Sequence, residues 1–201
     1  MSLPLPGERP FRWLEVLLAI IVVFGLCALG CASTGGRRAA PHARSVAAAA
    51  EREARHGAPA GANESAAFVE RALHDAGLRF GTDGSTRALW GYLRTAHRLV
   101  GPRDARAGDV LFFDTRGVAT LPECADEAGI VESVSSDGRI TFVQARDGRV
   151  RRSFVDPSRP TARRNAQGEI LNSFLRPIRI DDPPGSRYFA GEMLCGIARA
   201  L

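Results

Sequence analysis

The chain has 201 residues and a net charge of +5, and all 27 of its basic side chains are arginines. A pI near 9.6 favours contact with anionic polymers or phospholipid headgroups, because net charge governs association rather than fold. No helix-turn-helix, zinc-finger or RNA-binding pattern accompanies the arginines, so no nucleic-acid partner is expected.

Residues 1–30 predict an export signal or a membrane anchor. Arg9 and Arg12 precede the uncharged apolar run Val16–Gly30. As a helix this run spans only about 22 Å, short of the roughly 30 Å hydrocarbon core of a bilayer, which favours a secretory signal over a membrane span. The small residue before Cys31 resembles a bacterial lipobox, so we expect cleavage to leave Cys31 as a lipid-bearing first residue. A retained anchor is the alternative.

Composition divides the rest of the chain into two parts. Residues 31–44 are rich in Ala, Gly, Ser and Arg, which is typical of a flexible tether. Residues 45–201 are long enough for one compact domain with its own core. We therefore expect a leader, a tether and a single folded domain.

Three helices are predicted at the start of the domain. Ser45 is placed to cap a helix from Val46 to about His56, and Asn63 to cap a second helix over residues 64–76. Gly77 ends that second helix. Ser85 caps a third helix, which extends through residue 97.

Strands are predicted to follow the helices. The expected strands cover residues 109–114, 128–134, 139–144 and 150–155, with tight turns at residues 135–138 and 146–148. An apolar segment follows at 170–175, and residues 188–201 predict a terminal helix. Helices followed by a meander of strands indicate an α+β domain.

Three segments resemble the motifs of one enzyme family. Residues 63–69 read Asn-Glu-Ser-Ala-Ala-Phe-Val, residues 107–113 read Ala-Gly-Asp-Val-Leu-Phe-Phe, and residues 127–134 read Glu-Ala-Gly-Ile-Val-Glu-Ser-Val. They resemble Asn-Asp-Cys-Ser/Thr-Gly-Leu/Phe-Val, Pro-Gly-Asp-Leu-Val-Phe-Phe and His-Val-Gly-Ile-Val-Glu-Ser-Val of NlpC-type and CHAP-type papain-like cell-wall hydrolases. The resemblance extends from about Ser45 to Leu201. It implies a papain-like fold, with N-terminal helices packed on an antiparallel strand meander and a C-terminal helix.

The resemblance places Ser65 at the family's nucleophilic cysteine and Glu127 at its histidine. A serine hydroxyl is far less acidic than a thiol, and a carboxylate has no cationic form to assist a leaving group. No catalytic residue is therefore expected. Gln144 matches the family's third polar residue, or it is an edge-strand side chain that bonds solvent. Four further residues are expected around the cleft: Asn63, Asp109, Cys124 and Asn172.

The remaining candidate residues indicate neither a metal site nor a catalytic base. The stretch Thr115–Pro122 has no acidic residue, so neither a metal nor another cofactor is expected. His97 is the one histidine that we consider as a recruited base, and the other three are interpreted as surface residues. Export permits a disulfide between Cys124 and Cys195, although Cys195 also suits the role of a small buried hydrophobe.

Three functions remain open from the sequence. The favoured hypothesis is a membrane-tethered, catalytically inactive domain of the bacterial cell envelope, facing the periplasm or the exterior. It would bind peptidoglycan peptide or regulate a cell-wall enzyme. The second is an active amidase or endopeptidase with an unorthodox site. The third is a structural lipoprotein whose groove is vestigial.

Overall fold

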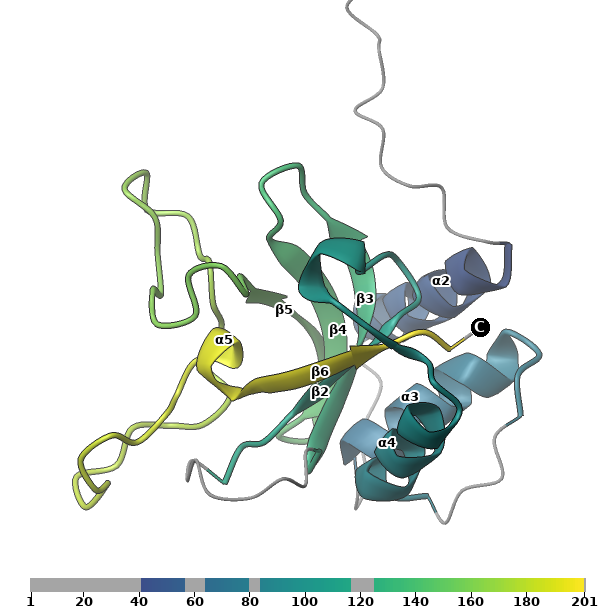
Figure 1. The fold of residues 1–201 in the computed structure, drawn as a ribbon, viewed down its shortest axis with the longest axis horizontal. Helices are drawn as coiled ribbons and strands as arrows, with labels where there is room; N and C mark the ends of the chain where they lie inside the picture. The colour runs from purple at the N-terminus through teal and green to yellow at the C-terminus, as the bar shows by residue number, and fades with distance from the viewer. Residues whose placement is uncertain (1–40, 57–63, 80–83, 117–124, 201) are drawn as a thin grey trace, which may run out of the picture. The chain divides into compact units, whose positions relative to one another are not determined.

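The computed structural model describes residues 41–56, 64–79, 84–116 and 125–200 (Figure 1). The elements occur in the order α2 (Pro41–His56), α3 (Glu64–Asp75), α4 (Thr86–Thr95), β1 (Leu99–Val100), the 3₁₀ turn η1 (Pro102–Asp104), β2 (Val110–Phe113), β3 (Glu127–Val134), β4 (Ile140–Arg146), β5 (Arg149–Val155), α5 (Ala190–Met193) and β6 (Leu194–Ala198). No helix within these described ranges is both long and apolar enough to cross a bilayer.

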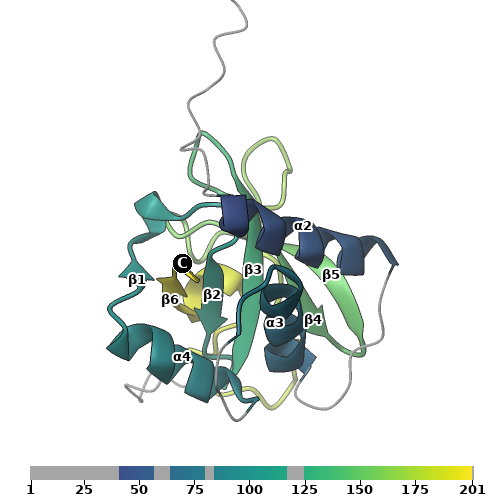
Figure 2. The same cartoon turned by 90° about the vertical axis from the view of Figure 1, so that its right-hand side faces the viewer.

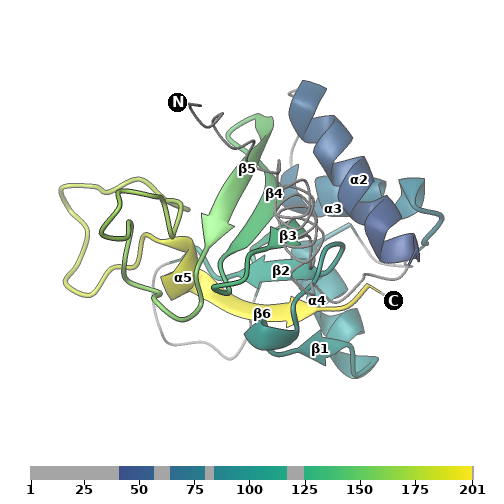
Figure 3. The same cartoon turned by 90° about the horizontal axis from the view of Figure 1, so that it is seen from above.

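The described strands form one antiparallel six-stranded sheet with the order β1-β6-β2-β3-β4-β5. Helices α2, α3 and α4 cover one face of this sheet, as Figure 2 shows. The long loops after β5 and the short helix α5 lie on the opposite side (Figure 3). The expected α+β class and the strand meander from β2 to β5 are therefore confirmed.

Apolar side chains pack against both faces of this sheet, under the helices on one face and under the loops and α5 on the other. In β2, Val110 and Phe112 belong to the cluster under the helices, whereas Leu111 and Phe113 belong to the cluster under the loops and α5. Successive side chains of a strand point to opposite faces, so a strand covered on both sides needs an uninterrupted apolar run. That requirement explains the four consecutive apolar residues of β2.

The predictions were accurate for the end of α3, the start of α4 and both turns, whereas α4 ends at Thr95 rather than at residue 97. The Ser85 hydroxyl accepts a hydrogen bond from the Ala88 amide at 3.1 Å and caps α4 as predicted. Gly77 follows α3 with a φ of +82°. Asp147 and Gly148, with φ of +50° and +76°, form the tight turn between β4 and β5.

The first helix begins earlier than predicted. Pro41 is the first residue of α2, so Ser45 lies inside the helix and its hydroxyl donates to the Pro41 carbonyl at 3.1 Å. Proline suits the first turn of a helix because its missing N–H would have no partner there. The buried Ala43 packs in this extra turn. Residues 41–44 are therefore helical rather than part of a tether.

The predicted terminal helix over residues 188–201 is wrong. Only Ala190–Met193 forms a helical turn, and the following residues form β6, which pairs with both β1 and β2. A Cβ at Gly196 would lie 2.5 Å from the Trp90 ring, so only glycine lets β6 pass this close to α4. Tertiary packing thus overrides the helical propensity of a segment rich in Ala, Met, Glu and Leu.

Cys195 is exposed at the start of β6 and is disulfide-bonded. Its interpretation as a buried, free small hydrophobe is therefore wrong. Cys31 and Cys124 lie outside the described residues, as do Asn63 and the leader.

Candidate functional site

An open pocket of about 500 Å³ lies where the starts of α3, α4 and β3 meet the turn between β4 and β5. It is lined by residues from all four elements: Glu64, Ser65, Ser85, Thr86, Arg87, Ala125, Asp126, Glu127, Arg146 and Asp147. The two positions that the sequence paired, Ser65 and Glu127, therefore line one pocket. We call it the Ser65 pocket.

The packing of α3 fixes Ser65 in this pocket. Phe68, Val69 and Leu73 are fully buried between α3 and the sheet. This packing places the first turn of α3 at the edge of the pocket. The Glu64 carboxylate accepts the Gly148 amide at 3.0 Å and ties the β4–β5 turn to the same helix end. Ser65 is 6% exposed, and its Oγ lies 3.4 Å from Oγ1 of Thr86. Two hydroxyls from two helix starts thus face each other.

Glu127 is the first residue of β3, and its carboxyl is strongly perturbed. Burial raises its pKa to about 7, while Arg146 opposes this rise and Asp126 adds to it. The Ser65 hydroxyl interacts with the same carboxyl and lowers its pKa. Oε2 of Glu127 is buried and has no hydrogen-bond partner among the described residues. One oxygen of the Glu127 carboxyl can therefore form a hydrogen bond with a ligand in the pocket.

Arg146 ends β4 and faces this carboxyl without a direct ion pair. Its side chain is 13% exposed, and Nε lies 3.8 Å from Oδ2 of Asp147. Burial lowers its pKa, while Glu127 and Asp147 raise it. Nη1 is buried without a hydrogen-bond partner in the described part of the chain. The sequence predicted only a turn at Arg146. The feature of the sequence that could have identified Arg146 is its position at the end of an apolar strand, just before an Asp-Gly turn.

Gln144 does not line the pocket. It is fully buried on β4, an interior strand, so its interpretation as an edge-strand side chain is wrong. Its Nε2 donates to Oγ of Ser153 on β5 at 2.8 Å, and its Oε1 has no partner among the described residues.

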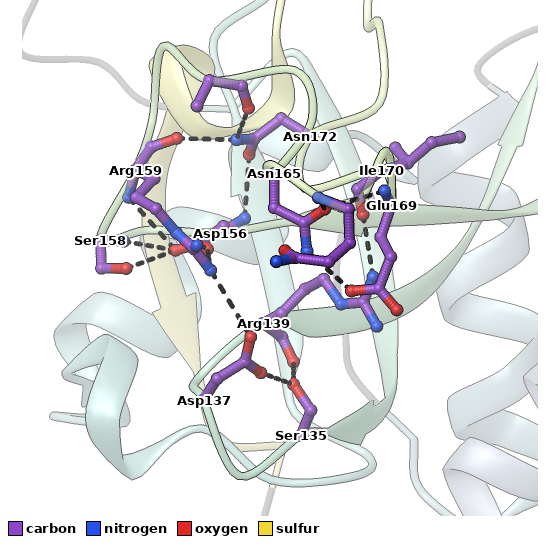
Figure 4. A network of polar contacts seen from close by, with 12 residues as sticks. Ser135, Asp137, Arg139, Asp156, Ser158, Arg159, Asn165, Glu169, Ile170 and Asn172 are labelled. Atoms are coloured by element: carbon purple, nitrogen blue, oxygen red, sulfur yellow. Dashed lines mark hydrogen bonds and ion pairs between the residues drawn. The ribbon is translucent and has the colours of Figure 1, made fainter.

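Asn172 belongs to a loop network outside the pocket lining (Figure 4). Its Oδ1 accepts the Asp156 amide at 2.9 Å, and its Nδ2 donates to the carbonyls of Arg159 and Ala162 at 2.9 and 2.8 Å. Asn172 is fully buried, so these bonds hold the loop after β5 in place.

Asp109 also lies outside the pocket lining, just before β2. Its Oδ2 accepts the Arg106 amide at 3.0 Å, and its Oδ1 lies 3.6 Å from Nε of Arg199. Burial raises the pKa of this carboxyl, and the two arginines oppose the rise. We interpret Asp109 as a structural residue that ties the start of β2 to the end of the chain.

All four histidines fall within the described ranges, and none of them lines the Ser65 pocket. His97 is exposed after α4, with a φ of +53°. The described residues also contain no group of three or more His, Cys, Asp or Glu side chains arranged to hold a metal ion. No family model, curated protein or solved structure matches the chain.

Proposed function

We propose that the chain is a membrane-tethered, catalytically silent NlpC/CHAP-like domain that binds a peptidoglycan peptide in the Ser65 pocket. The arrangement of the pocket supports a papain-like origin. Ser65 stands in the first turn of a helix and Glu127 opens the strand that faces it, in the order that the family motifs predict. The proposed location is the bacterial cell envelope, with Cys31 as the lipid attachment site.

The observation that carries the proposal is a pair of oppositely charged side chains in one pocket, each with one buried atom that has no hydrogen-bond partner in the described part of the chain. Oε2 of Glu127 and Nη1 of Arg146 are both buried without a hydrogen-bond partner among the described residues. Leaving a buried polar atom unpaired costs about 1–3 kcal/mol, so a ligand that pairs both of these atoms would recover that free energy. A peptide supplies both partners, because an amine donates to Glu127 and a carboxylate or carbonyl accepts from Arg146.

The same pocket supports binding better than bond cleavage. The Ser65 hydroxyl faces the Thr86 hydroxyl and a carboxyl that is close to half protonated at neutral pH. Activation of a serine requires a base that removes its proton and later returns one to the leaving group. Since no histidine lines the pocket, a carboxyl would have to perform both steps, and it lacks the cationic form by which an imidazole assists a leaving amine.

The disulfide at Cys195 supports an exported location. Disulfide bonds persist in oxidising compartments such as the periplasm and the cell surface. The apolar leader and the small residue before Cys31 are consistent with export and lipidation.

A sacculus-binding assay tests the proposal. Glu127→Gln and Arg146→Gln should each reduce retention of the chain on purified sacculi by about 10-fold, because a hydrogen bond to a charged group is worth about 1.5–3 kcal/mol. Arg149→Gln is the matched control, since Arg149 is exposed beside the same turn and lines no part of the pocket. Undiminished retention of both pocket variants would contradict the proposal. Absence of retention by the unmodified chain would favour the structural lipoprotein.

The pKa of Glu127 near 7 favours a second candidate function, a serine amidase or endopeptidase. A carboxylate with this pKa next to a serine hydroxyl is a possible general base. We expect the unmodified chain to release no wall fragments above background. Hydrolysis that disappears in Ser65→Ala would replace our proposal with this one. The double variant Ser65→Cys with Glu127→His tests whether a thiolate and an imidazole restore weak cleavage, because nucleophile and base act as a unit.

A further inference from the structure

Two further hollows lie next to the Ser65 pocket. Arg146 and Asp147 line the pocket and also both hollows, which have volumes of about 480 and 610 Å³. The first, the Ile178 hollow, adds Phe174, Pro177 and Ile178. The second, the Arg179 hollow, adds Arg116, Arg176 and Arg179. The three hollows are adjacent because they share Arg146 and Asp147, and we call the three together the groove.

The charge of this groove reverses along its length. Four acidic side chains and two arginines line the Ser65 pocket. Four arginines and two acidic side chains line the Arg179 hollow. One of those two acids, Asp182, is occupied within the protein: it pairs with Arg176 and accepts the Arg179 amide at 2.7 Å and the Tyr188 hydroxyl at 2.9 Å. The arginines of this hollow are paired in the same way, Arg176 with Asp182, Arg116 with Asp114 and Arg146 with Asp147. Arg179 is the lining arginine to which the described residues supply no acidic partner, so it is the group at this end that is left for an acidic ligand.

Internal contacts stabilise the loop at residues 176–187, which lines the Arg179 hollow. Asp182 is bonded to three parts of the loop, and the Arg176 guanidinium lies 5.1 Å from the centre of the Tyr188 ring. Figure 1 shows the loop projecting from the side of the sheet opposite the helices. Ile178 is 66% exposed and lines its hollow next to Phe174 and Pro177. An apolar ligand group that covers Ile178 would remove this surface from water.

We infer that the ligand is an extended peptide with a fixed direction. Its amine end lies at Glu127, an apolar side chain covers Ile178, and its acidic end lies at Arg179. The amine end rests on the proposed function, whereas the apolar and acidic positions rest on the two hollows alone. The ligand class is therefore a short peptide that carries an amine, then an apolar side chain, then carboxylates.

Calorimetry on the full-length chain in detergent tests this inference with three synthetic probes. The first is Ala-Leu-Glu-Glu with free termini, the second is its N-acetylated form, and the third is Ala-Leu-Gln-Gln amide. We expect acetylation to weaken binding about 10-fold through loss of the charge-assisted bond to Glu127. Arg179→Gln should weaken the first probe about 10-fold and leave the third unchanged. Ile178→Ser should weaken all three about fivefold.

Two controls match these variants. Ile180→Ser changes an isoleucine that is fully exposed on the same loop and lines none of the three hollows. Arg149→Gln again removes an arginine outside the groove. Neither should alter the affinity for any probe.

The outcomes separate this inference from the proposed function. If Glu127→Gln weakens binding but Arg179→Gln and Ile178→Ser do not, the pocket stands and the extended groove is overturned. If the loop variants weaken binding while acetylation and Glu127→Gln have no effect, the pocket fails and the proposed direction fails with it. No binding of any probe at millimolar concentration overturns the peptide class.

Discussion

Gly108→Ala is expected to destabilise the fold by more than about 3 kcal/mol, because it adds overpacking to backbone strain. Gly108 has a φ of +88°, and a Cβ there would lie 2.2 Å from the Ala43 carbonyl oxygen and 2.7 Å from the carbonyl carbon. These are backbone atoms of α2, so the rotation of a side chain cannot relieve the clash. Urea denaturation of the full-length chain measures the effect.

Gly138→Ala is the matched control. Gly138 also has a φ of +88°, but a Cβ added there would have no atom within 4 Å. It therefore carries the left-handed strain alone, which costs about 1–2 kcal/mol. An equal decrease in the free energy of unfolding for the two variants would mean that α2 does not pack closely against Gly108.

Glu127→Gln is expected to stabilise the fold by about 2 kcal/mol at pH 8 and to have little effect at pH 4. The folded-state pKa of about 7 lies above the ordinary 4.5, so the folded protein holds this proton more tightly than the unfolded chain. Stability then falls as pH rises from about 4.5 to 7 and is level above that range. One pKa unit corresponds to about 1.4 kcal/mol, and solvent in the open pocket reduces the total to about 2 kcal/mol.

Thermal unfolding at several pH values measures this difference. Glu132→Gln on the same strand is the control, because Glu132 makes a surface ion pair with Arg152 at 2.7 Å. Its removal should cost less than about 1 kcal/mol, with no gain at high pH. A Glu127→Gln variant that is less stable than the unmodified chain at pH 8 would contradict the raised pKa of the Glu127 carboxyl.

The parts of the fold that depend on neighbouring residues could be predicted from the sequence. Ser85 caps α4, Gly77 follows α3, and Asp147-Gly148 forms a hairpin turn, because capping and positive φ are local requirements. The strand β6 could not be predicted, because its conformation is set by β1, β2 and the ring of Trp90, which lie far away in the sequence. Local propensity alone favoured a helix there.

The candidate site was predictable only in part. The family motifs placed Ser65 and Glu127 opposite each other, and both line one pocket. Arg146 was missed because its role comes from burial at the end of β4 and from the field of Glu127, neither of which has a sequence motif. Asp109 was taken as a cleft residue because it falls within one of the family motifs, and Asn172 was also expected at the cleft. Their buried hydrogen bonds to the backbone show structural roles instead.

The most direct test of the pocket is the titration of the Glu127 carboxyl, followed by NMR on chain labelled with ¹³C in its glutamates. We expect a pKa near 7 in the free protein. A saturating soluble peptidoglycan stem peptide should lower this pKa, because an ammonium group bound at Oε2 stabilises the carboxylate. Arg146→Gln should raise the pKa in the free protein, since Arg146 opposes the effect of burial. A Glu127 pKa that is unchanged by the stem peptide would contradict a binding site at this carboxyl.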